Sequence, residues 1–282
     1  MVNKEIFQII SNLYKKHPWI GLNEKGLLSL LYDDCKTDEE RELIIKLLND
    51  FFYMANDSFL INIDNIARKL IQYNPTETLI YASAVGRESD SSQLIAYTLK
   101  TFLVKHGNNP WQKSNLYSHM SKSVLYKHNP DDIKNIIIID EFNGSGQTIK
   151  TRYKEIINNI KSVGKNEKDF NIEFIYITSI ESAHDSVISE GIKLLSMNTI
   201  KQGISSNTNI ENKDEAKEII RRISNVLSTQ FLSEIMYPLG YNDSEALYYR
   251  ETGNVPNSVF PIFWWPEYED KKDRNQLIMR AI

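Results

Sequence analysis

The stretch that most constrains the fold of this chain is IIIIDEFNGSGQT, residues 136–148. Four successive isoleucines suit a β-strand in a parallel sheet covered on both faces, because such strands are continuous apolar runs. The run ends at two acidic residues, passes through a short loop with two glycines and leads into a helical pattern. The sequence therefore predicts a strand, a tight loop and a helix in immediate succession.

Two further apolar runs, residues 79–85 and 174–180, are also followed by polar loops and helical patterns. Regular alternation of strand and helix is typical of the α/β class, and we expect a central, mainly parallel sheet flanked by helices. Ligands of such sheets bind beyond the carboxyl ends of the strands. The loops after Val85, Ile139 and Ile180 are therefore expected to lie together.

The chain is expected to have two parts. Residues 1–75 form an N-terminal helical region, because their apolar residues recur at helical spacing and no chemistry-bearing motif occurs there. The dipeptide Asn74-Pro75 marks the boundary, since a residue before proline is disfavoured in a helix. Residues 76–282 form the α/β domain, including an aromatic C-terminal tail.

Composition narrows the environment of the protein. The formal net charge of −4 gives no overall basic field for binding nucleic acid. The single cysteine cannot form an internal disulfide, which favours a reducing, cytoplasmic location. No run approaches the roughly 20 apolar residues that a membrane helix needs, so no membrane partner is expected.

The glycine loop has the features of a phosphate-binding site. Glycines allow main-chain N–H groups to approach an anion closely, and a helix N-terminus contributes partial positive charge. Hydroxyl side chains add further donors. The predicted phosphate-binding residues are Gly144, Ser145, Gly146, Gln147 and Thr148.

The two acids before the loop are the predicted sugar and metal ligands. Asp140 and Glu141 can accept hydrogen bonds from the vicinal hydroxyls of a ribose or orient a hydrated Mg²⁺. A ribose that carries both a phosphate and two vicinal hydroxyls would satisfy the glycine loop and the two acids together. The structural alternative is that the acids only end a strand and Ser145 only caps a helix.

Two other phosphate loops fit less well. A Walker loop requires lysine after its last glycine, where this chain has Gln147. A dinucleotide fingerprint requires three glycines and an acid downstream, whereas this loop has two and its acids precede it.

The segment resembles the phosphoribosyl-diphosphate-binding motif of type I phosphoribosyltransferases, which has four apolar residues, two acids and a glycine-containing loop. The resemblance implies the type I phosphoribosyltransferase fold. It also implies that Asp140 and Glu141 hold a ribose and that residues 144–148 hold its 5-phosphate. The chain departs from the motif at three positions, since Glu141 replaces an aspartate, Asn143 an apolar residue and Gly144 a threonine or serine.

The loop after the first strand supports the resemblance. In type I enzymes the comparable loop holds the diphosphate, which implies that Gly86, Arg87 and Ser91 bind this group, with Arg87 as a catalytic cation. The alternative is that Asp90 or Ser91 only caps the following helix.

The C-terminal segment YNDSEALYYRETGNVPNSVFPIFWWP resembles the tail of phosphoribosyltransferase-like domains of the PRTase-CE type, found in bacterial conflict and antiphage systems. This implies a bacterial antiphage effector that binds phosphoribosyl diphosphate or a nucleotide with Mg²⁺ and transfers or cleaves a ribosyl group. Implied partners are an ATPase or a retron reverse transcriptase, and an acceptor such as tRNA.

Alternatives remain open at the sequence level. A non-catalytic module that senses a nucleotide and regulates a defence complex fits the altered acids, and an interaction protein with vestigial loops would bind no phosphate. Trp264 and Trp265 either stack on a base or pack in the core.

Overall fold

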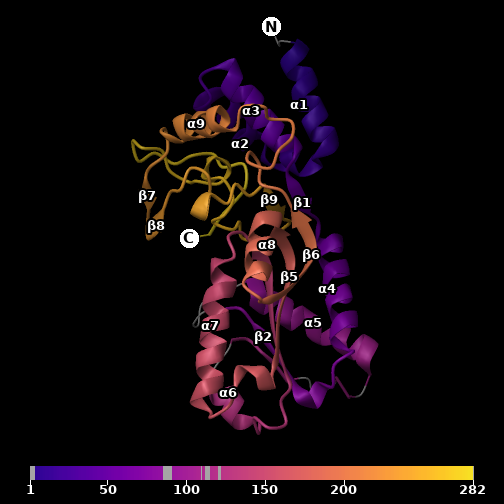
Figure 1. Cartoon of the computed structure of the whole chain (residues 1–282). Helices are drawn as coiled ribbons and strands as arrows, with labels where there is room; N and C mark the ends of the chain where they lie inside the picture. Colours follow the sequence, from indigo (N-terminus) through magenta and orange to yellow (C-terminus); the bar gives the residue numbers. More distant parts are fainter. Residues whose placement is uncertain (1–3, 85–90, 109, 112–114, 120–121, 282) are drawn as a thin grey trace. The chain divides into compact units, whose positions relative to one another are not determined.

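The computed structural model describes residues 4–84, 91–108, 110–111, 115–119 and 122–281 (Figure 1). The chain forms two compact units. One consists of residues 56–200, and the other combines residues 1–55 with residues 201–282. No described helix is both long enough and apolar enough to cross a membrane.

The first unit is built on a five-stranded sheet in which every strand pair is parallel. This confirms the predicted α/β class with a parallel central sheet. The spatial order is β3-β2-β4-β5-β6, with strands β2 (Thr78–Ala82), β3 (Asn115–Tyr117), β4 (Asn135–Asn143), β5 (Asn171–Ile180) and β6 (Lys193–Ile200).

The strand order creates a switch point between β2 and β4. From β2 the chain crosses to β3 at one edge, and after β4 it proceeds in the other direction through β5 to β6. Loops that leave neighbouring strands in opposite directions open a crevice at the carboxyl ends, where α/β proteins bind ligands. The carboxyl ends of β2 and β4 border this crevice, and the loops that follow these strands are the two predicted to bind phosphate groups.

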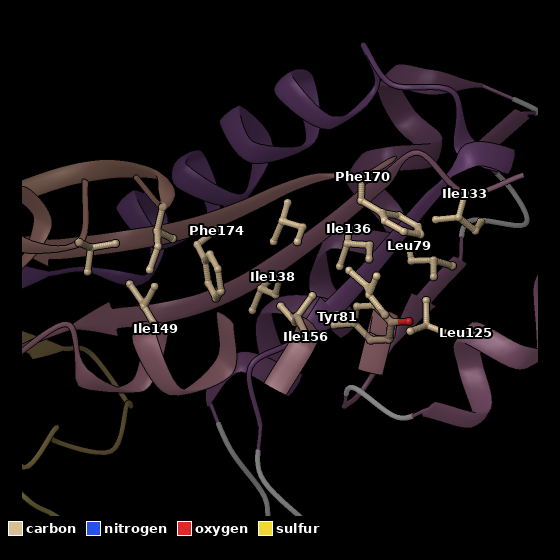
Figure 2. Close-up of a cluster of buried hydrophobic side chains, with 14 of the residues drawn as sticks. Leu79, Tyr81, Leu125, Ile133, Ile136, Ile138, Ile149, Ile156, Phe170 and Phe174 are labelled. Carbon is tan, nitrogen blue, oxygen red and sulfur yellow. The ribbon is translucent and has the colours of Figure 1, made fainter. Parts of the chain in front are cut away.

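Helices cover both faces of the sheet (Figure 1). Helices α4 (Asn56–Leu70) and α5 (Ser91–Gly107) pack on one face, and α7 (Gln147–Ser162) on the other with α6 (Lys122–Lys127) and α8 (Glu181–Ser189). The isoleucines of residues 136–139 are all buried because each face has its own cover. Figure 2 shows Ile149 and Ile156 of α7 directed toward the sheet side chains Ile138 and Phe174.

An ion-pair cluster joins α4 to α5. The Asp64 carboxylate accepts from His106 at 2.7 Å and from Arg68 at 2.7 Å, and it contacts Lys105 at 3.1 Å. These partners, His106 first, hold the pKa of Asp64 well below its usual range. Helix α4 thus belongs to the sheet unit although it lies within residues 1–75.

The second unit draws on both ends of the chain. It contains α1 (Lys4–Lys16), α2 (Glu24–Leu28), a π-helical segment (Ser29–Asp34), α3 (Asp38–Asn49) and α9 (Lys213–Ser224). Strand β1 (Phe52–Met54) pairs in parallel with β9 (Tyr248–Arg250), and β7 (Gln230–Phe231) with β8 (Glu234–Ile235) form a hairpin. The structure therefore groups residues 1–55 with the C-terminal segment, whereas the sequence suggested a boundary near residue 75.

The two tryptophans of the tail are core residues. Trp264 and Trp265 are buried, and their indole N–H groups donate to the Val259 carbonyl and to Ser228 Oγ, both at 2.9 Å. A buried ring with a satisfied N–H has no face left for a base. The core alternative for this pair is confirmed.

A buried ion pair fixes the tail to the π-helical segment. Arg274 donates through Nε and Nη2 to Oδ2 of Asp34, at 2.9 and 2.7 Å. Its Nη1 donates to the Trp265 carbonyl, and Nη2 also donates to the Ile262 carbonyl. The side chains of Arg274 and Asp34 are 0% and 1% exposed. Removing one buried partner leaves the other charge buried without a counter-charge. The resulting loss of folding free energy is far larger than the net contribution of the pair.

Replacing Arg274 with methionine is expected to destabilise the protein by about 3–5 kcal/mol, because the Asp34 carboxylate loses its cation. Denaturant unfolding measures the change. The control is Arg221→Met, which removes an exposed pair with Glu218 and is expected to cost under about 1 kcal/mol. Equal midpoints for the two variants would contradict the role given to the buried pair.

Candidate functional site

The loop predicted to bind phosphate lies between β4 and α7. Strand β4 continues to Asn143, past the isoleucines of residues 136–139, because its pairing with β5 extends to Asn143 opposite Ser179. The two acids therefore lie inside the strand instead of after it. Gly144, Ser145 and Gly146 form the turn, and Gln147 begins the helix. The predicted order of strand, tight loop and helix is confirmed.

Asn143 shapes this turn from within. Its Oδ1 accepts a hydrogen bond from the Gly146 N–H at 2.9 Å, and Ser145 Oγ accepts from the Gln147 N–H at 3.4 Å. Two of the main-chain donors predicted for a phosphate thus have partners inside the loop. The first turn of α7, including the Thr148 hydroxyl, still presents the positive end of the helix dipole at the crevice.

Gly146 is required by both conformation and space. Its φ of 78° is left-handed, and a Cβ there would lie 3.0 Å from Val187 Cγ2 and 3.4 Å from the Ala183 carbonyl oxygen. A side chain would therefore meet backbone strain and the packing of α8 together. The loop can only pass this close to α8 with glycine at the position.

Asp140 and Glu141 differ in environment. Successive residues of a strand point to opposite faces of the sheet, and Asp140 is partly exposed whereas Glu141 is only 3% exposed. The two acids thus do not present a matched pair of carboxylates on one face. Their joint role in holding a ribose stays a prediction, with Asp140 the more accessible residue.

Tyr176 lies beside Asp140 on the neighbouring strand. The two residues are direct partners in the register of β4 and β5, and Tyr176 is 1% exposed. Burial, and next the negative charge of Asp140, raise the pKa of Tyr176 well above its ordinary value. Tyr176 thus places a neutral hydroxyl beside the Asp140 carboxylate.

Of the two acids, Asp140 is the better candidate for holding a magnesium ion that binds together with its substrate. Among the described residues no group of three or more His, Cys, Asp or Glu side chains is placed to hold a metal. Mg²⁺ is usually held by one or two carboxylates together with substrate phosphates and water, so a dedicated cage is not needed. The partly exposed Asp140 suits this mode, and Glu141 is less accessible for it.

The first loop is only partly described. Ser91 begins α5 and is partly exposed, as expected for a residue near the crevice. Gly86 and Arg87 lie outside the described residues, so their assignment to the diphosphate stays a prediction. Ser83 and Ala84, which follow β2, are described and buried.

Two residues at this site escaped the sequence analysis. Asn143 was noted only as a departure from the family motif, yet its side chain holds the turn. Arg152 of α7 donates through Nε to the Ser83 carbonyl at 3.1 Å. It therefore links the helix after the glycine turn to the residue that follows β2. Its signal was available, because Arg152 lies at helical spacing from Ile149 and Ile156, where an apolar residue is expected.

A surface cavity of about 640 Å³ lies in the other unit, lined by residues that include Asp33, Asp34, Tyr268 and Glu269. Its acids stand beside Lys36 and Lys272, so it has no strong charge of one sign. None of its lining residues belongs to the loops at the switch point, and it contributes nothing to the site above.

A parallel sheet with helices on both faces and a glycine turn after the switch-point strand make this unit an α/β domain with a candidate phosphate-binding turn. The family model named PRTase-CE matches residues 33–280, and the chain belongs to this family. The match extends into both compact units, because it includes residues 33–55 and 201–280 of the unit that is built from the two ends of the chain.

Solved structures with similarity include two phosphoribosyltransferases. The xanthine-guanine-hypoxanthine phosphoribosyltransferase of Helicobacter pylori is 15% identical with a TM-score of 0.29, over 53% of this chain and 86% of that one. The orotate phosphoribosyltransferase of Aeropyrum pernix is 14% identical with a TM-score of 0.28, over 51% and 71%. No curated protein matches the chain.

Replacing Gly146 with alanine is expected to cost about 1–2 kcal/mol for the left-handed backbone and about 1–3 kcal/mol for crowding against Val187. The matched control is Gly164→Ala, because Gly164 has a φ of 76° but open space around a Cβ. Thermal or denaturant unfolding should show a larger loss for Gly146→Ala. Equal losses would mean that α8 does not restrict the turn.

Proposed function

We propose that this protein binds phosphoribosyl diphosphate or a nucleotide together with Mg²⁺ and transfers or cleaves the ribosyl group, as the effector of a bacterial antiphage system. The observation that carries the proposal is the glycine turn of residues 144–146 at the switch point of a parallel sheet, at the end of the strand that bears Asp140. A phosphate at this turn puts its ribose hydroxyls within reach of the strand that bears the acid.

The reaction would exchange one bond at C1 of the ribose. The bond from C1 to the diphosphate oxygen breaks, the diphosphate leaves with the electron pair, and a nucleophile of the acceptor forms the new bond to C1. Bound Mg²⁺ would supply positive charge to the departing diphosphate. The chain would hold the sugar through Asp140 and the 5-phosphate through the first turn of α7, which are positioning and electrostatic roles.

Membership of the PRTase-CE family supports the proposed defence role. The PRTase-CE resemblance implies a place in bacterial conflict systems, with an ATPase or a retron reverse transcriptase as protein partner. A nucleotide or an RNA such as tRNA is the proposed acceptor. The net charge of −4 favours recognition of RNA through a local patch or through the partner, since the chain has no general basic field.

A second function has an observation in its favour. Glu141 is buried, so the acidic pair departs in geometry as well as in sequence from a symmetric ribose clamp. A site with one accessible carboxylate suits a module that binds a nucleotide and regulates its partner without chemistry. The two functions share the ligand and differ in turnover.

Asp140→Asn tests the shared ligand site. The substitution keeps the shape of the side chain and removes its charge, and we expect about a 10- to 100-fold loss of affinity for phosphoribosyl diphosphate with Mg²⁺, the magnitude of one hydrogen bond to a charged group. Titration calorimetry measures the change. The control is Asp185→Asn, because Asp185 is an exposed acid on α8 of the same unit.

Mass spectrometry then separates the two functions. The effector requires a ribosylated or cleaved product from wild-type protein, alone or with its partner, and none from Asp140→Asn. Binding without product in every combination supports the sensor. A wild-type protein that binds neither phosphoribosyl diphosphate nor nucleotides would refute both.

A further inference from the structure

The surface cavity of about 640 Å³ has no part in the proposed function. Its size lies within the range of pockets that bind small molecules. Its lining residues come from residues 29–36, from the tail residues 268–275 and from Val226, and all of them belong to the unit of residues 1–55 and 201–282. The cavity is therefore contained within one unit of the chain.

The π-helical segment Ser29–Asp34 builds one wall of the cavity. Hydrogen bonds in such a helix connect residues five apart, as in the bond from the Cys35 N–H to the Leu30 carbonyl at 3.2 Å. This winding brings Ser29 and Asp34, which are five residues apart, to the same side of the segment, and both line the cavity. Single π-helical turns are rare and occur frequently at functional sites.

The tail forms the other wall, and buried contacts fix it in place. Arg274 donates to Asp34, and a Cβ on Gly26 would lie only 2.2 Å from the Gln276 carbonyl oxygen, so the tail backbone packs directly on α2. The Tyr268 hydroxyl lies 3.3 Å from Ser29 Oγ in the first wall. Since protein contacts hold both walls, the cavity does not need a ligand to form.

Asp34 leaves one hydrogen-bond acceptor without a donor at this cavity. Arg274 bonds only to Oδ2, and Oδ1 has no hydrogen-bond partner in the described parts of the chain, although the side chain is 1% exposed. Burial raises the pKa of Tyr268 and the charge of Asp34 raises it further, so this hydroxyl lies near the carboxylate. A buried acceptor without a donor is costly, and a ligand that brings an N–H or O–H group would offset this cost.

The charges in the lining are already compensated. Arg274 neutralises Asp34, and Lys272 pairs with Asp270 at 2.6 Å. A cationic ligand at Asp34 would add a second positive charge beside the buried Arg274, and an anionic ligand would compete with Asp270 for Lys272. The cavity therefore favours a ligand without net charge.

The lining combines hydrogen-bond acceptors with donors around one aromatic ring. Carboxylates only accept and ammonium groups only donate, whereas the hydroxyls of Ser29 and Tyr268 and the amide of Asn275 do both. A sugar hydroxyl also donates and accepts, so a ligand with several hydroxyls can satisfy both kinds of group. The half-buried Tyr268 adds a flat apolar face against which a sugar or a base can pack.

We propose that this cavity binds an uncharged, hydroxyl-rich ligand of the sugar or nucleoside class, which donates hydrogen bonds to the carboxylates of the lining and packs on Tyr268. The inference goes beyond the proposed function, because none of the lining residues belongs to the glycine turn or to the strand that bears Asp140. Free sugar and nucleoside share the vicinal hydroxyls, and a nucleoside adds a base with N–H groups and a planar face.

Titration calorimetry of the full chain with adenosine and with D-ribose tests the proposal. We expect saturable binding of adenosine at a dissociation constant below about 1 mM. Tighter binding of adenosine than of ribose identifies a nucleoside site, and equal affinities identify a site for the sugar alone. In Tyr268→Phe the affinity should fall by about 3- to 10-fold, as for one lost neutral hydrogen bond, and Val226→Phe should abolish binding because the added ring fills the cavity.

Tyr237→Phe is the matched control, because Tyr237 is an exposed tyrosine of the same unit outside the cavity lining, and its affinity should equal that of wild type. Glu269→Gln serves if the Tyr268 variant does not fold, since Glu269 is an exposed acceptor of the lining and its loss should also weaken binding. Unfolding midpoints without ligand separate a loss of affinity from a loss of stability.

The results that overturn the inference are specific. They are no binding of either compound by wild-type protein, wild-type affinity in both Tyr268→Phe and Val226→Phe, or loss of adenosine binding in Asp140→Asn, which would assign the ligand to the glycine turn. Adenosine binding by a protein that does not bind phosphoribosyl diphosphate would support the cavity site and count only against the proposed function.

Discussion

The parallel pairing of β2 with β4 is the constraint on which the site depends. The two strands are neighbours in space although α5, β3 and α6 lie between them in sequence, and the next strand after each lies on the opposite side of the pair. This arrangement is stable because residues 136–139 are buried under helices on both faces. The hydrophobic burial that holds the strands together thus also fixes the distance between the loops at their ends.

Much of this fold was predictable from the sequence, since long apolar runs followed by polar loops identify strands that are buried on both faces. The division of the chain was less accessible. Strand β1 pairs with β9 through main-chain hydrogen bonds, and three-residue strands carry little periodicity of their own. The helical pattern of residues 56–70 resembles that of the helices before it, so the sequence does not show that this helix belongs to the sheet unit. The structure shows it, because Asp64 contacts His106 of α5.

The candidate site shows the same limit at the level of single residues. The turn between β4 and α7 was predictable, because two glycines between an apolar strand and a helical pattern indicate a tight connection. The orientation of Asp140 and Glu141 could not be predicted, because it depends on how far the strand continues. Pairing with β5 continues β4 as far as Asn143. Arg152 was visible as a charge on an apolar stripe, but only the folded chain reveals Ser83 as its partner.

The pairing of β1 with β9 has a consequence for biosynthesis. A ribosome delivers residues 1–55 first and must then complete the whole of residues 56–200 before the complementary segment emerges. Such non-local contacts have high contact order and form slowly, and meanwhile α3 lacks its neighbour α9. The sheet unit is continuous in sequence, so its folding does not depend on a later segment. Residues 56–200 can therefore fold before the two ends of the chain have paired.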